Sequence, residues 1–121
     1  MYTVKQAAQR LGMSEYTIRF YTDKGLIPSL KRDGNNRRLF DEESLRYLAT
    51  VKCLRECGMP VDSVKAYCDL CSQGDSTIQA RYDILLKQTE AARRQLEEAQ
   101  ARLKHLNHKV ENLRRLLDGR G

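Results

Sequence analysis

Apolar residues follow two different patterns along the chain, and the pattern changes near residue 75. Before that point, short apolar groups alternate with glycines and polar turns, which is typical of several short helices. From Ser76 onward, apolar residues recur at alternating steps of four and three, with no glycine or proline before Gly119. This coiled-coil stripe predicts an unbroken helix of about 60 Å at 1.5 Å per residue.

The first two helices are marked by residues that start and stop helices. Thr3 and Gln6 form a capping-box pattern, and Gly12 supplies a left-handed stop. Ser14 then caps a second helix, which we expect to end near Gly25. The connection between them has the length of a helix-turn-helix turn, so this motif is predicted over about residues 4–24.

A polar loop centred on Asp33 and Gly34 is flanked by short apolar pairs, which predicts a β-hairpin wing over about residues 26–40. Asp41 is placed to cap a third helix that runs to about Cys57, and a fourth helix follows over residues 61–72. The predicted fold is mainly α, with a winged helix-turn-helix DNA-binding domain followed by a long dimerisation helix. Its boundaries are 1–74 for the winged domain, 75–118 for the helix and 119–121 for a tail.

The C-terminal stripe is too narrow for one helix to bury alone, so it predicts a partner helix. We interpret the partner as a second copy of the chain. The alternative, a helix that folds back on its own domain, is disfavoured because a helix of this length outruns a small domain. The dimerisation residues are Ile78, Tyr82, Leu85, Leu96, Leu103, Leu106, Val110, Leu113 and Leu117.

Positive charge is concentrated at the N-terminal end. The whole chain has a formal net charge of +6, and residues 1–40 hold eight basic and three acidic residues. A basic end on a nearly neutral remainder indicates a polyanionic partner, with counterion release driving much of the affinity. The second helix and the wing supply the predicted contacts to double-stranded promoter DNA: Tyr16, Thr17, Arg19, Phe20, Tyr21, Lys24, Asn36, Arg37 and Arg38.

Three segments carry a family resemblance: Thr-Ile-Arg-Phe-Tyr at 17–21, Lys-Gly-Leu-Ile-Pro at 24–28 and Asn-Arg-Arg-Leu-Phe at 36–40. They resemble the winged-helix signature of MerR-type bacterial transcription regulators, although Phe20 replaces a frequent Tyr and Asn36 stands where an aromatic residue often precedes the wing arginine. The resemblance runs from about residue 4 to residue 117. It implies an antiparallel coiled-coil dimer on a promoter with an overlong spacer. Bending and untwisting of that DNA then aligns the two promoter elements for RNA polymerase.

The same resemblance also indicates what kind of effector the regulator responds to. The chain ends in residues 118–121, so we expect no C-terminal effector domain, and no cysteine follows Cys71, unlike the metal sensors of the family. The surroundings of Cys53 resemble the subgroup that answers aldehydes, nitrosative stress or other electrophiles, in which a cysteine here is the proposed sensor. Cys53 lies off the aliphatic stripe of its helix, and we expect Arg46 and Arg55 to lower the pKa of its thiol. The alternative is an inert thiol packed against the partner's long helix.

Two other interpretations stay open. Cys53, Cys57, Cys68 and Cys71 form two pairs that together would suit a four-thiolate zinc site, although Cys68 is also predicted as a core residue. In another class, the chain would be a coiled-coil adaptor whose basic end binds acidic protein surfaces.

Several classes of protein are excluded by what the sequence lacks. No apolar run reaches the roughly 18 residues of a membrane span, and the N-terminus has no signal-peptide layout. We therefore expect a cytoplasmic protein with reduced thiols and no membrane partner. No catalytic or phosphate-binding motif is present, so the chain is predicted not to be an enzyme and to carry no cofactor.

Overall fold

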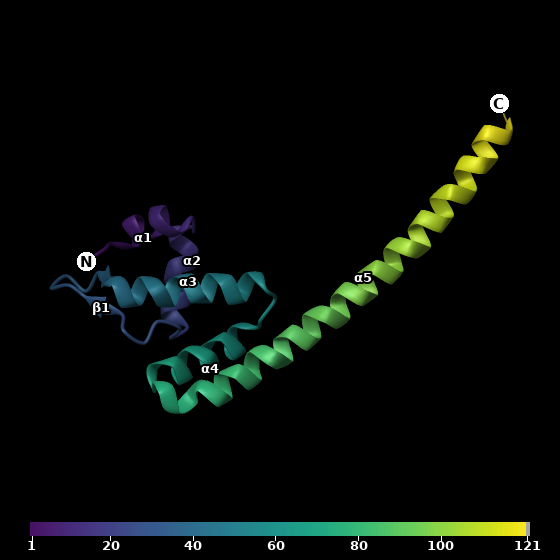
Figure 1. Cartoon of the computed structure of the whole chain (residues 1–121). Helices are drawn as coiled ribbons and strands as arrows, with labels where there is room; N and C mark the ends of the chain where they lie inside the picture. Colours follow the sequence, from purple (N-terminus) through teal and green to yellow (C-terminus); the bar gives the residue numbers. More distant parts are fainter. Residues whose placement is uncertain (121) are drawn as a thin grey trace. The chain divides into compact units, whose positions relative to one another are not determined.

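The computed structural model describes residues 1–120 and is helical over most of its length (Figure 1). The elements in chain order are α1 (Val4–Leu11), α2 (Glu15–Asp23), β1 (Lys31–Arg32), β2 (Arg38–Leu39), α3 (Glu42–Glu56), α4 (Val61–Ser72), the 3₁₀ turn η1 (Asp75–Thr77) and α5 (Ile78–Arg120). The chain folds as two units, Met1–Leu85 and a second that begins at Leu86. The predicted mainly α fold, a winged helix-turn-helix with a long C-terminal helix, is confirmed.

The helix starts follow the capping residues of the sequence. The Gln6 amide donates to Thr3 Oγ1 at 3.2 Å, and the Thr3 amide donates to Gln6 Oε1 at 2.9 Å, which completes the predicted capping box. The Thr17 amide donates to Ser14 Oγ at 3.0 Å at the start of α2. Gly12 ends α1 at φ +65°, a left-handed conformation that costs glycine little.

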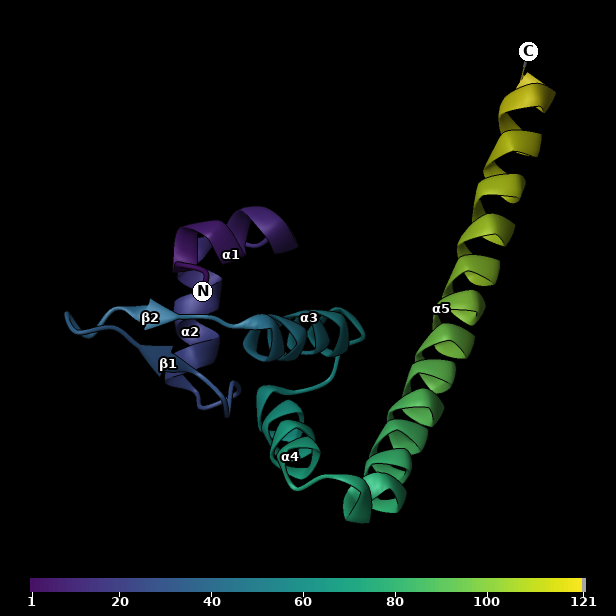
Figure 2. The same cartoon turned by 60° about the vertical axis from the view of Figure 1, so that its left-hand side comes forward.

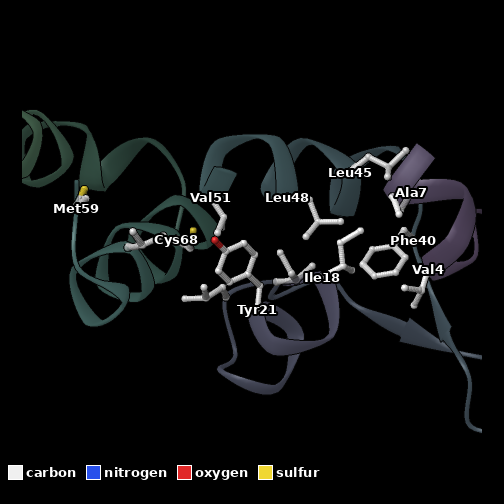
Figure 3. Packing of buried hydrophobic residues seen from close by; sticks show 14 residues of the cluster. Val4, Ala7, Ile18, Tyr21, Phe40, Leu45, Leu48, Val51, Met59 and Cys68 are labelled. Atoms are coloured by element: carbon white, nitrogen blue, oxygen red, sulfur yellow. The ribbon is translucent and has the colours of Figure 1, made fainter. Parts of the chain in front are cut away.

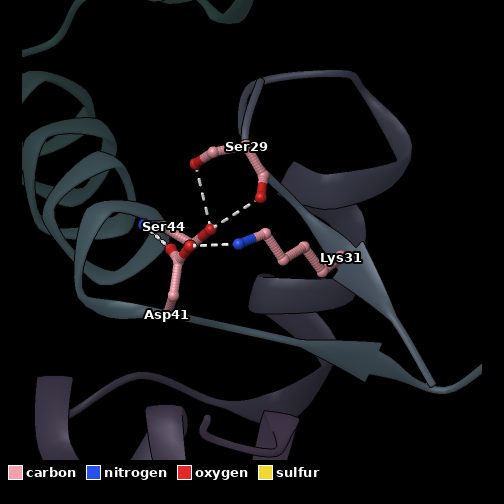
Figure 4. A network of polar contacts seen from close by, with 4 residues as sticks. All are labelled: Ser29, Lys31, Asp41 and Ser44. Carbon is pink, nitrogen blue, oxygen red and sulfur yellow. Dashed lines mark hydrogen bonds and ion pairs between the residues drawn. The ribbon is translucent and has the colours of Figure 1, made fainter.

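Asp41 caps α3 and also fastens that helix to the wing. Its Oδ1 accepts the Ser44 amide at 2.8 Å, and its Oδ2 pairs with Lys31 Nζ at 2.9 Å. These contacts lower the pKa of Asp41 to about 2, and the hydrogen bond from the Ser44 amide has the largest effect. Ser44 is fully buried, and its hydroxyl donates to Ser29 O at 3.1 Å (Figure 4). The start of α3 is therefore held against the first strand of the hairpin, β1, and the residue Ser29 that lies shortly before it.

The wing is a short antiparallel hairpin in which Lys31 lies opposite Leu39 and Arg32 opposite Arg38 (Figure 2). The Asp33 carboxylate closes its tip by accepting the amides of Asn35 at 2.8 Å and Arg37 at 2.9 Å. The Arg37 amide in particular lowers the pKa of Asp33. Asn36 has φ +61°, a left-handed conformation that asparagine tolerates better than an aromatic residue does.

One hydrophobic core joins the four short helices to the end of the wing (Figure 3). Phe40 and Ile18 are fully buried in this core, and each such side chain contributes about 1.5–3 kcal/mol on burial. Cys68 also lies in the core, as predicted from the stripe of its helix. The full set of buried apolar residues is Val4, Ala7, Ala8, Ile18, Tyr21, Leu26, Ile27, Phe40, Leu45, Leu48, Val51, Met59, Val64 and Cys68.

The long helix α5 follows the η1 turn, where the buried Thr77 hydroxyl lies 2.7 Å from both Leu70 O and Gly74 O. The helix runs to Arg120, two residues past the expected end at residue 118. Within its described part no residue is buried, and most of its stripe residues are exposed to solvent, with Leu103 57% and Leu117 69% exposed; Leu85 is partly buried. None of the helices described in residues 1–120 combines the length and the apolarity needed to cross a membrane.

Candidate nucleic-acid interface

The outer side of α2 carries several of the predicted DNA contacts. Tyr16 is 79% exposed, and Arg19 and Phe20 are exposed on the same helix. The Lys24 ammonium lies 5.6 Å from the centroid of the Phe20 ring, a cation–π distance. An exposed aromatic and basic surface along the second helix is what a helix-turn-helix protein places in the major groove.

A groove of about 480 Å³ separates this helix from the wing and the start of α1. It brings together residues that are far apart in the sequence, and four of the predicted contacts lie on its walls. These four are Arg19, Asn36, Arg37 and Arg38. Lys5 adds a further positive charge that the sequence analysis did not select. The groove thus joins recognition helix and wing into one basic surface.

Two of its arginines are paired with carboxylates of their own element. Arg19 Nη2 lies 3.3 Å from Glu15 Oε1, and Arg37 Nε lies 3.1 Å from Asp33 Oδ2. Exposed pairs of this kind contribute between zero and about 1 kcal/mol. Because these pairs are weak, both guanidinium groups can exchange their carboxylate for a DNA phosphate at small cost.

Three predicted contact residues are placed differently. Tyr21 is only 9% exposed and belongs to the core, because it lies on the inner face of α2 with Ile18. Thr17 is partly buried in the helix cap, where the Ser14 hydroxyl donates to its Oγ1 at 2.7 Å. Arg38 has a side chain only 20% exposed, with Nε donating to Thr22 Oγ1 at 2.8 Å and Nη2 2.7 Å from Asp23 Oδ1. In the free chain Arg38 therefore ties the wing to the end of α2.

The four cysteines are not brought together. Cys53 and Cys57 are exposed on and just after α3, whereas Cys68 is fully buried on α4, where burial raises the pKa of its thiol to about 12. Among residues 1–120, no group of three or more His, Cys, Asp or Glu side chains is arranged to hold a metal ion. The four-thiolate zinc site is therefore wrong for the single chain, because core packing takes Cys68 away from the exposed pair.

The cations near Cys53 are directed elsewhere. Lys52 Nζ donates to Leu11 O at 2.8 Å, and Arg55 Nη1 donates to Met59 O at 2.8 Å. Arg46 instead lines a cavity of about 260 Å³ that also includes Cys71. Of the two arginines expected to act on Cys53, Arg55 is thus bonded to a backbone carbonyl and Arg46 lines this cavity.

Arg81 is a residue that the sequence analysis missed. Its Nε donates to Thr77 Oγ1 at 3.0 Å, its Nη2 donates to Gly74 O at 3.3 Å, and its Nη1 lies 3.9 Å from Cys71 Sγ. Cys71 is only half-buried. The one local signal was the four-residue spacing of Thr77 and Arg81, which puts them on the same helix face.

A sequence profile described as "MerR HTH family regulatory protein" matches residues 2–71, more than half of the chain. This chain belongs to the MerR family. A second profile, described as "MerR, DNA binding", matches residues 45–109. The protein is therefore a DNA-binding transcriptional regulator, and this finding replaces the alternative of a coiled-coil adaptor.

Individual relatives agree with this assignment. The chain is 34% identical over 109 residues to an HTH-type transcriptional regulator of Haemophilus influenzae, covering 90% of this chain and 81% of the relative. It is 35% identical over 82 residues to the HTH-type transcriptional regulator AdhR of Bacillus subtilis, covering 68% of this chain and 59% of AdhR. The crystal structure of HiNmlR, a MerR family regulator lacking the sensor domain and bound to promoter DNA, superposes with a TM-score of 0.74 at 34% identity, covering 90% of this chain and 86% of HiNmlR. The prediction of a regulator, not an enzyme, is confirmed.

Proposed function

We propose that this MerR-family regulator acts as a homodimer on promoter DNA and responds to aldehydes, nitrosative stress or related electrophiles through Cys53. The observation that carries the sensing role is the exposed thiol on α3, the helix whose start is bonded to the wing. Cys53 lies twelve positions after Asp41, about 18 Å along a rigid helix. A covalent change at Cys53 thus acts on the element that positions the wing through the ion pair of Lys31 with Asp41.

The dimer in this proposal is formed by α5. Its apolar stripe runs from Ile78 to Leu117 and is mostly solvent-exposed in the single chain, as a seam that requires a second helix would be. We assign residues 1–74 to DNA binding, residues 75–118 to an antiparallel coiled coil and residues 119–121 to a tail. Two basic N-terminal units on one coiled coil match a twofold-symmetric operator.

On DNA, the proposed contacts include contacts to base edges and contacts to backbone phosphates. Tyr16, Arg19, Phe20 and Lys24 are available from α2, and Asn36 and Arg37 from the wing tip. The dimer distorts a promoter with an overlong spacer, so that RNA polymerase in the cytoplasm engages both promoter elements. The response then depends on DNA deformation energy and needs no new base contact.

The sensing role is tested by Cys53→Ala in a reporter strain exposed to formaldehyde or to an S-nitrosothiol. We expect induction to fall to the uninduced level while operator affinity is retained, because Cys53 does not line the basic groove. Cys71→Ala is the matched control, since Cys71 is less exposed, and its induction should be preserved. An undiminished response of Cys53→Ala removes this thiol from the mechanism.

A further inference from the structure

The end of α3 presents a second exposed thiol beside Cys53. The Cys57 amide donates to Cys53 O at 3.1 Å, so the two residues are one helical turn apart. Both side chains are exposed. Side chains at this spacing share a helix face, with Cβ atoms about 5–6 Å apart. The structure therefore presents a dithiol, and the two sulfur atoms can approach the same small molecule from one side.

The spacing decides what kind of bridge suits this dithiol. A disulfide needs Cβ atoms about 3.5–4.5 Å apart, closer than two neighbours on an intact helix face. Direct oxidation of Cys53 with Cys57 would therefore require the last turn of α3 to change conformation. An atom that bonds to both sulfurs increases the Cβ–Cβ distance that the bridge can span, so the helix does not have to change conformation.

The number of protein ligands at this site further restricts which atoms could bridge the two sulfurs. A structural zinc ion takes four protein ligands, and no third His, Cys, Asp or Glu joins this pair to complete a metal site in the described part of the chain. A ligand that fits this pair needs only two protein thiolates and brings any remaining substituent itself. Thiolates are soft ligands that select soft, thiophilic centres. A trivalent arsenic atom that carries one organic group meets both conditions.

We propose that Cys53 and Cys57 form a two-thiolate capture site for monosubstituted trivalent arsenicals. In the reaction an arylarsonous acid loses two As–O bonds and gains two As–S bonds, and its two hydroxyl groups leave as water with the two thiol protons. Arsenic stays trivalent, so no oxidant or reductant is required. The inference deepens the proposed sensing role of Cys53 and rests on it, since it names a class of molecule that would act at the same thiol.

Two bonds hold the arsenical far better than one. Once Cys53 has bound, Cys57 competes for the second position as an intramolecular thiol at high effective concentration. Such linkage increases affinity by about 10²–10⁴-fold over a single contact. A monothiol in solution is then a poor competitor, whereas a small dithiol can remove the arsenical because it also forms two bonds.

The experiment uses the reduced full-length protein and phenylarsine oxide, with excess glutathione as competitor and intact mass spectrometry as readout. We expect one phenylarsenic group per chain, released by a small dithiol and mapped by proteolysis to the peptide that holds both cysteines. Cys53→Ser and Cys57→Ser should each reduce retention about 100-fold or more, because either change leaves a single bond. Cys71→Ser is the matched control and should retain the wild-type adduct.

A rescue variant tests the geometry. Ala49 is exposed one turn before Cys53, so Ala49→Cys combined with Cys57→Ser restores the spacing on the other side of Cys53. Retention should return in this double variant. Undiminished capture by Cys57→Ser, an adduct located on Cys68 or Cys71, or failure of the double variant to recover retention would each overturn the two-thiolate site.

Capture and sensing are separated by a second readout. In the reporter strain, Cys57→Ser should lose the response to phenylarsine oxide and keep the response to formaldehyde, which needs one thiol only. If Cys53→Ala still responds to formaldehyde while the purified wild-type protein retains the arsenical, the sensing role fails and the capture site stands. If the purified wild-type protein retains no arsenical while Cys53→Ala is unresponsive, the capture site fails and the sensing role stands.

Discussion

At the scale of single residues, the two neighbouring wing arginines differ in exposure and in bonding partners, although the sequence presents them as equivalent. Arg37 is 73% exposed and is bonded to Asp33, four positions before it in the same hairpin. Arg38 is mostly buried and is bonded to Thr22 and Asp23, which belong to another element. The sequence could not distinguish them, because the partners of Arg38 are fifteen and sixteen residues away and meet it only in the folded chain.

This difference predicts distinct effects of two alanine substitutions. Arg37→Ala should weaken binding to all DNA sequences alike and lower the salt slope of the affinity by about one, because one phosphate contact is lost. Its melting temperature should stay close to that of the wild type, since an exposed pair contributes at most about 1 kcal/mol. Arg38→Ala should instead lower the melting temperature and reduce discrimination between operator and scrambled DNA, because the wing loses its tie to α2. Fluorescence anisotropy at several salt concentrations, combined with thermal unfolding, measures both.

The two variants also test whether Arg38 stays in place on DNA. If Arg38→Ala changed the salt slope as Arg37→Ala does, and left the melting temperature unaltered, Arg38 would exchange Thr22 and Asp23 for phosphate in the complex. Arg38 would then bind a DNA phosphate directly and would not serve to orient the wing.

At the scale of elements, local sequence signals predicted where the helices begin and end. They did not predict which residues of different elements contact one another. The caps at Thr3, Ser14 and Asp41 act on residues three positions away, so they are visible in the sequence and are found in the structure. Met59 lies between two helices, where no periodic pattern marks it as a core residue, yet it is only 1% exposed in the core. Tyr21 was expected at DNA although its position beside Ile18 on the inner face of α2 buries it. Burial of this kind depends on which elements meet, and periodicity alone does not supply that information.

The long helix α5 allows a test of the proposed dimer at one position of its stripe. Leu103→Asp should weaken dimerisation at least about 100-fold, because a carboxylate buried in an apolar seam without a partner costs several kcal/mol. Ala101→Asp is the matched control, since it adds the same charge about 200° away around the helix. Sedimentation velocity at micromolar concentration should find a monomer for Leu103→Asp and a dimer for both Ala101→Asp and the wild type.

The N-terminal unit should be unaffected by either change. Its core is built from residues up to Cys68, with Ile84 packed against it, so its thermal unfolding should match that of the wild type. A dimer that survives Leu103→Asp would place the contact between chains outside the stripe.

At the scale of the whole molecule, charge and apolar surface are separated along the chain in the way that a dimeric DNA regulator requires. Residues 1–40 hold most of the net charge of +6, and the exposed apolar stripe belongs to α5. In the proposed dimer, the basic part meets DNA and the stripe joins two such parts on one duplex. The proposed mechanism then turns a change at a thiol into a change in DNA shape, so the promoter itself becomes part of the switch.

That mechanism makes a prediction about promoter DNA, with the protein left unchanged. If the regulator activates by deforming an overlong spacer, shortening the spacer to ordinary length should give strong transcription that needs neither the protein nor the inducer. Scrambling one half of the operator in the original promoter should instead abolish induction, because only one N-terminal unit of the dimer then finds its site. Transcription in vitro with purified RNA polymerase measures both. Continued dependence on the regulator after the spacer is shortened would indicate direct recruitment of the polymerase, because a promoter that is already aligned gains nothing from being bent.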